Sequence, residues 1–264
     1  MTIELLDSIT DATDTTVGKI VVSGSHGGLY PAAVASLAGA RAVLFNDAGI
    51  GLDQAGVAGV LALADAGMAA AGVDCNTCHI GSASDTFERG IVSVVNPIAA
   101  SLGLTVGMPA PDAVALLANA PQPHATLKPH TEARQTVTIG AGGLTAELLD
   151  SASLVNASDI GKIVITGSHG GLIGGDATRA IKATVRTAIF NDAGFGADSI
   201  GTTRLPALEA RTIAAVTVSC DTARIGDAAS ALETGIISAL NPSAQKTGAA
   251  IDMPLSTWLS ILKR

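Results

Sequence analysis

Aromatic rings, cysteine and positive charge are all scarce in this sequence, and each shortage disfavours a class of function. Aromatic residues make up 2% of the 264 residues, so the chain lacks the stacking platforms of single-stranded nucleic-acid binders. The formal net charge is −8, with 15 Lys and Arg against 23 Asp and Glu, which disfavours nucleic acid and anionic lipid as partners. Three cysteines, Cys75, Cys78 and Cys220, are too few for a disulfide framework. The expected partner is a small molecule.

Export signals and membrane anchors are not evident either. Residues 1–7 have neither a basic region nor an apolar run, which predicts a cytoplasmic location. The most apolar stretch, residues 55–73, is nearly long enough to cross a membrane, but Asp65 and several glycines interrupt it. We therefore expect this stretch to form a buried amphipathic helix, with no membrane partner.

Small apolar residues and glycine are what the chain has in quantity. Hydrophobic residues make up 48% of the sequence, and there are 30 glycines. A core of Ala, Val, Ile and Leu with close backbone packing is typical of helices lying on a parallel sheet. This composition predicts an α/β fold.

Most of the distinctive motifs occur twice, once in each half of the chain. The repeated motifs are Gly-Ser-His-Gly-Gly at 24–28 and 167–171, Phe-Asn-Asp-Ala-Gly at 45–49 and 190–194, Asn-Pro at 96–97 and 241–242, and Met-Pro at 108–109 and 253–254. The repeat indicates an internal duplication. We expect two tandem Rossmann-like units, 1–120 and 144–264, joined by a linker over 121–143 and related by a pseudo-two-fold axis.

Short β-branched runs alternate with helical stretches in both units, which predicts parallel strands with right-handed helical crossovers. The expected strands are 2–7, 19–23, 41–46 and 70–75, with copies at 145–150, 162–166, 186–191 and 214–219. The expected helices are 31–39, 53–66, 93–102 and one that starts at Pro111, with copies at 176–184, 198–210, 238–247 and 255–263. Residues 135–139 alternate in polarity and can add an edge strand.

The repeated glycine turn follows the first core strand, at the sheet edge where α/β proteins bind ligands. Its site residues are Ser25, His26, Gly27 and Gly28, and their copies Ser168, His169, Gly170 and Gly171. Histidine can move protons near neutral pH, and serine can act as a nucleophile or a hydrogen-bond donor. Glycine amides can bind a carboxylate or stabilise developing negative charge. The alternative is a tight turn whose histidine caps a helix.

A second polar turn ends the next strand of each unit. Asn46 and Asp47, with their copies Asn191 and Asp192, are expected beside the glycine turn on the same edge. The aspartates can orient the histidines, bind a substrate hydroxyl or ligate a metal. The alternative is turn chemistry, because Asn and Asp bond to their own backbone in such turns. Asp53 and Asp198 follow as expected helix N-caps.

The pentad Cys-Asn-Thr-Cys-His at 75–79 matches the attachment pattern of c-type haem. Its copy at 220–224 lacks the second Cys and the His, and the chain has few aromatic residues to line a haem pocket. A redox pair, half a zinc site or buried core cysteines are the other interpretations. Neither a dinucleotide fingerprint nor a P-loop occurs in the sequence. We expect no cofactor and no metal.

The dipeptides His169-Gly170 and Ser219-Cys220, or His26-Gly27 with Cys75, resemble the caspase-like cysteine peptidases. Those enzymes carry a catalytic His and Cys on neighbouring strands of an α/β sheet. The resemblance covers only these dipeptides, and an intervening strand and the duplication do not match it. It implies a Cys-His hydrolase as an alternative function.

The leading hypothesis is a hydrolase of an amide or ester bond in a carboxylated metabolite, with a lyase or isomerase as the second choice. His26 and His169 are the acid/base candidates, and Arg224, which replaces His79 of the first unit, is the expected anchor for an anionic group. A surface salt bridge with Asp227 is the alternative role for Arg224. A non-catalytic module that binds a small anion is the rival function. The sequence leaves the oligomeric state open, including a homo-oligomer.

Overall fold

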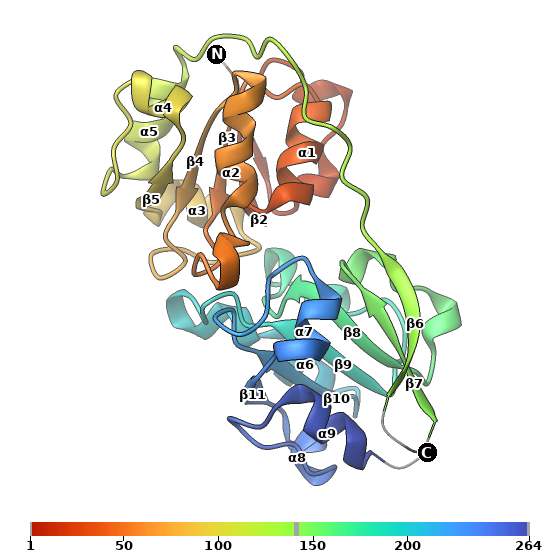
Figure 1. Ribbon diagram of the computed structural model, residues 1–264. Helices are drawn as coiled ribbons and strands as arrows, with labels where there is room; N and C mark the ends of the chain where they lie inside the picture. The colour runs from red at the N-terminus through yellow and green to blue at the C-terminus, as the bar shows by residue number, and fades with distance from the viewer. Residues whose placement is uncertain (1, 140–142, 263–264) are drawn as a thin grey trace.

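The computed structural model describes residues 2–139 and 143–262, which form two α/β lobes (Figure 1). We call residues 2–120 the first lobe, residues 121–133 the connecting segment, and residues 134–139 with 143–262 the second lobe. The first lobe contains a five-stranded sheet of order β1-β2-β3-β4-β5, and the second a six-stranded sheet of order β11-β10-β9-β8-β7-β6. The connecting segment passes over the first lobe and descends along one side to β6 (Figure 1).

Four parallel strands make the centre of each sheet, and an antiparallel strand extends it at one edge. The first sheet comprises β1 (Ile3–Leu6), β2 (Ile20–His26), β3 (Ala42–Asn46), β4 (Ala69–Val73) and the antiparallel β5 (Val92–Val95). The second comprises β7 (Leu144–Leu149), β8 (Ile163–His169), β9 (Thr187–Asn191), β10 (Ala214–Val218) and the antiparallel β11 (Ile237–Leu240). Strand β6 (Arg134–Ile139) pairs antiparallel with β7 and adds a second edge. The parallel core and the edge strand expected at 135–139 are thereby confirmed.

Helices cover both faces of each sheet, because successive strand residues point to opposite sides and both sides are apolar. The first lobe has α1 (Leu29–Leu37), α2 (Ala58–Ala62), α3 (Ala83–Arg89), α4 (Pro97–Ser101) and α5 (Ala110–Leu117). The second lobe has α6 (Arg204–Glu209), α7 (Ala228–Thr234), α8 (Pro242–Lys246) and α9 (Leu255–Ile261). In the first lobe, α1 and α2 share one core with Val21 and Phe45, and α4 and α5 share the other with Val22 and Leu44.

Two expectations about edge strands and caps were wrong. Residues 93–95 and 238–240 belong to β5 and β11, since the helices expected there begin only at Pro97 and Pro242. Asn96 and Asn241 cap these helices, as their side chains accept the amides of Ala99 and Ala244.

Asp53 and Asp198 are not N-caps. Both lie inside 3₁₀ turns with φ of 54°, where their side chains reach across to the other lobe.

The helix expected at 176–184 is also absent from the described second lobe. The chain there forms two 3₁₀ turns, Ile173–Gly175 and Ala177–Arg179, followed by irregular backbone to β9. Gly174 and Gly175 have positive φ, which a right-handed helix cannot accommodate. The second lobe therefore has no counterpart of α1, and this difference shapes one wall of the candidate site.

The carboxyl ends of the two sheets face each other, and the contacts between the lobes come in matched pairs. The amide of Leu52 donates to the carbonyl of Cys220 at 2.8 Å, and the amide of Ala197 donates to the carbonyl of Cys75 at 2.8 Å. Between these bonds the backbones of Gly49 and Gly194 touch: a Cβ on Gly49 would lie 3.0 Å from the Gly194 Cα. Ion pairs between His79 and Asp198, and between Arg224 and Asp53, flank this contact.

Within residues 2–139 and 143–262, none of the helices combines the length and the apolar character that crossing a bilayer requires. The apolar stretch 55–73 folds into α2, a 3₁₀ turn and the buried strand β4. Most of the stretch is buried, as expected, but the amphipathic helix expected there is limited to Ala58–Ala62, and Leu61 is exposed. The linker expected at 121–143 overlaps β6, and residues 140–142 of it lie outside the described residues.

The Gly49–Gly194 contact predicts that Gly49→Ala is markedly more destabilising than an alanine at an open glycine. Gly107 is the matched control, because it also has positive φ but would place a Cβ with nothing within 4 Å. Gly107→Ala should cost about 1–2 kcal/mol from left-handed backbone alone. Gly49→Ala adds the clash with Gly194, about a further 1–3 kcal/mol. Urea unfolding followed by circular dichroism measures both, and equal losses for the two variants would contradict the contact.

Candidate functional site

A cavity of about 860 Å³ opens between the lobes, at their facing carboxyl ends. Its walls come from the ends of β2 and β8, the starts of α1 and α7, the 3₁₀ turns that follow β1 and β7, and the connecting segment. Both repeated histidines, His26 and His169, line it. A cavity of this size suits a small-molecule ligand. The structure thus brings the two glycine turns together at one site.

His26 is held in one orientation by the turn that follows it. The Gly28 amide donates to its Nδ1 at 3.2 Å, so the neutral ring carries its proton on Nε2. Burial lowers the pKa of His26 to about 4, which keeps the ring neutral at pH 7. A Cβ on Gly226 would lie 3.7 Å from the His26 ring, so the histidine reaches the second lobe.

His169 is more deeply buried and less constrained. Its side chain ends β8 with 8% of the residue exposed, and its Nδ1 is a buried atom without a hydrogen-bond partner in the described residues. Burial, and then the positive charge of Arg204 and electrostatic coupling to the His26 ring, lower its pKa well below the usual value. A weaker contact with the Gly171 backbone partly offsets this lowering, and His169 is a neutral base candidate.

The glycines serve close packing more than anion binding. The amides of Gly27 and Gly170 donate to the carbonyls of Asn46 and Asn191, and the Gly28 amide is occupied by His26. A Cβ on Gly27 would lie 2.6 Å from Val60. Three of the four amides expected to stabilise negative charge are thus already bonded. The binding roles predicted for the four glycines find no direct support.

Ser25 and Ser168 line the cavity, but their oxygens are turned toward the backbone. The Ser25 hydroxyl accepts the amide of Ile9 at 3.0 Å, and the Ser168 hydroxyl accepts the amide of Ala152 at 2.9 Å. In the described residues neither hydroxyl bonds to a histidine. Among residues 2–139 and 143–262 these two serines therefore lack the Ser-His pairing that activates a serine nucleophile.

Asp47 and Asp192 organise the turns between the lobes. One oxygen of Asp47 accepts the amides of Gly49 and Cys75, and the other accepts the Ser93 hydroxyl at 2.7 Å. Asp192 likewise accepts the amides of Gly194 and Cys220. Burial raises the pKa of both carboxyls. Neither aspartate lines the large cavity or bonds to a histidine, so the orienting role predicted for them gains no support.

The asparagines beside them have the same structural character. The side-chain oxygen of Asn46 accepts the amide of Ala48, and that of Asn191 accepts the amide of Ala193, each at 2.9 Å. Both residues are buried and neither lines the cavity. They shape the turns that carry the glycine contact, and substrate binding by them stays a prediction.

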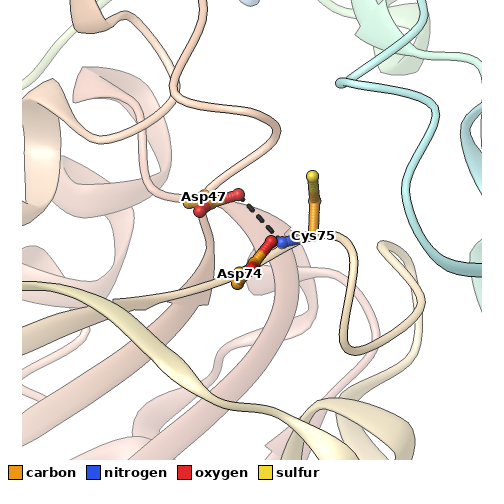
Figure 2. Close-up of side chains that lie close together, drawn as sticks. All are labelled: Asp47, Asp74 and Cys75. Atoms are coloured by element: carbon orange, nitrogen blue, oxygen red, sulfur yellow. Dashed lines mark hydrogen bonds between the residues drawn. The ribbon is translucent and has the colours of Figure 1, made fainter. Parts of the chain in front are cut away.

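Asp47, Asp74 and Cys75 form a cluster whose potential ligand atoms lie within 4.8 Å of one another (Figure 2). Asp47 holds the Cys75 amide, drawn as a dashed line, and Asp74 holds the amide of Asn76 at 2.8 Å. Burial, with the neighbouring charges of Asp47 and Asp74, raises the pKa of the Cys75 thiol. Hydrogen bonds from backbone amides therefore account for the positions of both carboxylates.

Cys220 lies apart from the histidines. It lines a separate cavity of about 510 Å³ with Asp192 and Ser219, whereas His169 lines the large cavity. Burial and the charges of Asp192 and Asp221 raise the pKa of Cys220 to about 12. A nucleophilic cysteine needs a thiolate and a nearby base. The pairing of Cys220 with His169 therefore gains no support from the two cavities.

Arg224 lines the cavity, but its charge is already matched. Its Nε donates to Asp227 at 3.0 Å, and its Nη1 donates to Asp53 of the first lobe at 3.0 Å. His79, at the corresponding position of the first lobe, bonds to Asp198 at 2.8 Å. Both residues connect the lobes. The anchoring role predicted for Arg224 would require a ligand to displace two carboxylates.

Arg204 is a site residue that the sequence reasoning missed. It begins α6, is only 3% exposed and lines the cavity beside His169. Its guanidinium lies 5.1 Å from the Phe190 ring centroid, and burial lowers its pKa to about 10, which leaves it charged at pH 7. The sequence offered one indication, a lone arginine opening a largely apolar helix, but not where its side chain points.

Glu132 and Tyr30 were missed as well. Glu132 lies in the connecting segment and Tyr30 in α1, and both line the cavity. Burial raises the pKa of Glu132 to about 6, partly opposed by hydrogen bonds with Ser151 and Tyr30. A carboxyl group that titrates near this pH is a candidate proton carrier. No local motif marks these residues, because only the fold brings the connecting segment to the cavity.

Comparison with protein-family models, curated proteins and solved structures found no match for this chain. Its function is therefore inferred from the chemistry of the cavity.

The buried His26 ring predicts a measurable pH dependence. Because its pKa in the folded state, about 4, lies below the usual 6.5, protonation favours the unfolded chain. The stability that neutral His26 retains at pH 7 should decline as the pH falls from 6.5 toward 4. Histidine NMR should give a titration midpoint near 4 for the signal that His26→Gln removes. A midpoint above 6 would contradict the burial.

Native thiols should resist alkylation. Cys75, Cys78 and Cys220 are buried, with raised pKa values that are about 11 for Cys78 and about 12 for Cys220. Iodoacetamide at pH 8, followed by mass spectrometry, should label none of them in the folded protein and all of them in denaturant. Rapid labelling of Cys75 or Cys220 in the folded protein would instead revive the cysteine hydrolase.

Proposed function

We propose that the protein is an enzyme for a small anionic metabolite and that the cavity between the lobes is its active site. One observation carries the proposal: neutral His26 and His169, from different lobes, line one cavity together with the buried cation Arg204. Neutral imidazoles can donate hydrogen bonds and accept protons at a reacting centre. A buried cation favours a ligand of negative charge.

Hydrolysis of an amide or ester by an activated water is the reaction that we propose. The serines lack a base, so direct attack by water fits the site better than a covalent serine intermediate. His26 is suited to donate its Nε2 proton in a hydrogen bond to the substrate carbonyl, since the Gly28 amide occupies Nδ1. His169 accepts the proton of the attacking water and returns it to the leaving group. The bond to the leaving amine or alcohol breaks as the carbonyl reforms.

We also propose that the lobes descend from a duplicated unit and are related by a pseudo-two-fold axis. The repeated motifs support this history, and so do the matched contacts Leu52–Cys220 with Ala197–Cys75. Such an arrangement puts one histidine from each copy on the shared cavity. The copies differ in what surrounds the histidine, so the two rings have different tasks in the proposed reaction.

A non-catalytic module that binds a small anion is the rival proposal. The observation that favours it is the fixed, neutral state of His26, which suits hydrogen bonding to a ligand without any proton transfer. Turnover measurements separate the two functions.

The test compares histidine variants on a panel of short amides and esters of dicarboxylic acids and N-acyl amino acids. His169→Gln should lower kcat by about 10²–10⁴, the usual contribution of a general base, with KM nearly unchanged. His26→Gln should lower kcat by about 10²–10³, because it removes a donor to developing negative charge. His124→Gln is the matched control, since His124 is exposed and does not line the cavity.

Wild-type protein that binds members of the panel but hydrolyses none would support the binding module. Hydrolysis that survives both His26→Gln and His169→Gln at the wild-type rate would reject the cavity as the active site. In both cases circular dichroism of the variants confirms that they are folded.

A further inference from the structure

Arg204 is a buried cation without an ionic partner. Its described hydrogen bonds go to backbone carbonyls only: Nε donates to Gly171 at 3.0 Å, and Nη1 donates to Arg179 and Ala180. No carboxylate forms an ion pair with it in residues 2–139 and 143–262. Burying a charge is costly unless an opposite charge or a dense set of dipoles surrounds it.

A structural role explains part of this arrangement. The described second lobe lacks a counterpart of α1, and several carbonyls between residues 171 and 183 that no helix would satisfy accept hydrogen bonds from arginine side chains instead. Arg211 performs this task at the outer end of the segment, where it donates to Ile181 at 2.8 Å and to Ala183 at 3.1 Å. Arg211 does not line the cavity, whereas Arg204 does. The structural role therefore does not account for a charge placed on the cavity wall.

The surroundings of Arg204 form a positively charged wall. Arg179 and Lys182 line the same side of the cavity. The nearest carboxylate to Arg179 is that of Asp11, at 3.9 Å, and Lys182 donates to the Ser153 carbonyl at 2.6 Å. Arg204, Arg179 and Lys182 thus place three positive charges on this part of the cavity wall, and Asp11 is the carboxylate at its edge.

The first lobe offers no equivalent wall. Gly59 occupies the place of Arg204, since its amide donates to Gly27 as the Arg204 amide donates to Gly170. A Cβ at Gly59 would lie 2.5 Å from Ala32 of α1, so that helix fills the space which the Arg204 side chain takes in the second lobe. The positive wall is thus specific to the second lobe.

We infer that Arg204 recognises the anionic group of the substrate, a carboxylate or a phosphate, and holds it against the second-lobe wall of the cavity. Arg179 and Lys182 assist at the rim. This inference rests on the proposed function only for the identity of the cavity as the active site. It gives Arg204, in place of Arg224, the task of anchoring the negative charge.

Anion binding at Arg204 has a consequence for His169. The positive charge of Arg204 disfavours protonation of His169, and a bound carboxylate or phosphate offsets that charge. His169 then accepts a proton more readily once the substrate is present. The negative charge of the substrate would thereby raise the pKa of the base that acts on it.

Binding of three probes tests the inference: succinate, inorganic phosphate and the neutral analogue succinamide, measured by calorimetry. Wild-type protein should bind succinate or phosphate at least tenfold more tightly than succinamide. Arg204→Gln retains donors for the carbonyls but loses the charge, and should weaken anion binding at least tenfold. Arg211→Gln is the matched control, because it changes the same segment away from the cavity and should bind as wild type. The preferred anion distinguishes a carboxylate site from a phosphate site.

Unchanged anion affinity in Arg204→Gln, or wild-type protein that binds neither anion at millimolar concentration, would overturn the inference. Should Arg204→Gln fail to fold, histidine NMR of the wild-type protein decides: the anion should raise the titration midpoint of His169, and no change would overturn the inference.

The two proposals fail separately. Anion binding that depends on Arg204, without any turnover, would reject the enzymatic function and retain the anion site. Hydrolysis by Arg204→Gln with wild-type kcat and KM would reject the anion site and retain the enzymatic function.

Discussion

The rest of the architecture depends on a backbone contact between two glycines. Gly49 and Gly194 meet where the carboxyl ends of the sheets face each other, at a separation that no side chain could enter. Because this contact is close, the ends of β2 and β8 come near enough to share one cavity. A larger residue at either position would push the lobes apart and separate His26 from His169. The candidate site is therefore a product of the interface, and neither lobe contains it alone.

The buried aspartates serve this contact. Asp47 and Asp192 each gather two backbone amides, which fixes the turns that present the glycines. Buried carboxylates need hydrogen-bond donors, and here backbone amides of the same chain supply them. Residues that look chemically versatile in the sequence are thus structural, while the positions that face the cavity carry the uncompensated groups. The candidate acid/base groups, His26 and His169, lie on the cavity, which neither aspartate lines.

Local sequence pattern was sufficient to predict the strands. The surroundings of the site residues depend on contacts between segments that are distant in the sequence. Short β-branched runs that alternate with helical stretches correctly predicted the parallel strands. Asn96 before Pro97 correctly marked a helix start. The repeated histidines were correctly expected at the sheet edge, because strand ends are local features. Arg204 and Glu132 could not be found in this way, since their surroundings come from segments distant in the sequence. The helix predicted at 176–184 was wrong because it assumed that the second half follows the structure of the first half beyond Gly174 and Gly175, which have positive φ.

An α-helix satisfies its own backbone hydrogen bonds, so its side chains can be substituted without changing the course of the backbone. The irregular segment after Gly171 has no such independence, because Arg204 and Arg211 hold its carbonyls. On this side of the cavity Arg204 both holds the wall together and contributes to its charge. Substitution of Arg204 would therefore alter the charge of the cavity and the local folding in the same step. A change of charge at this position is tolerable only where the replacement or its neighbours rebuild the wall.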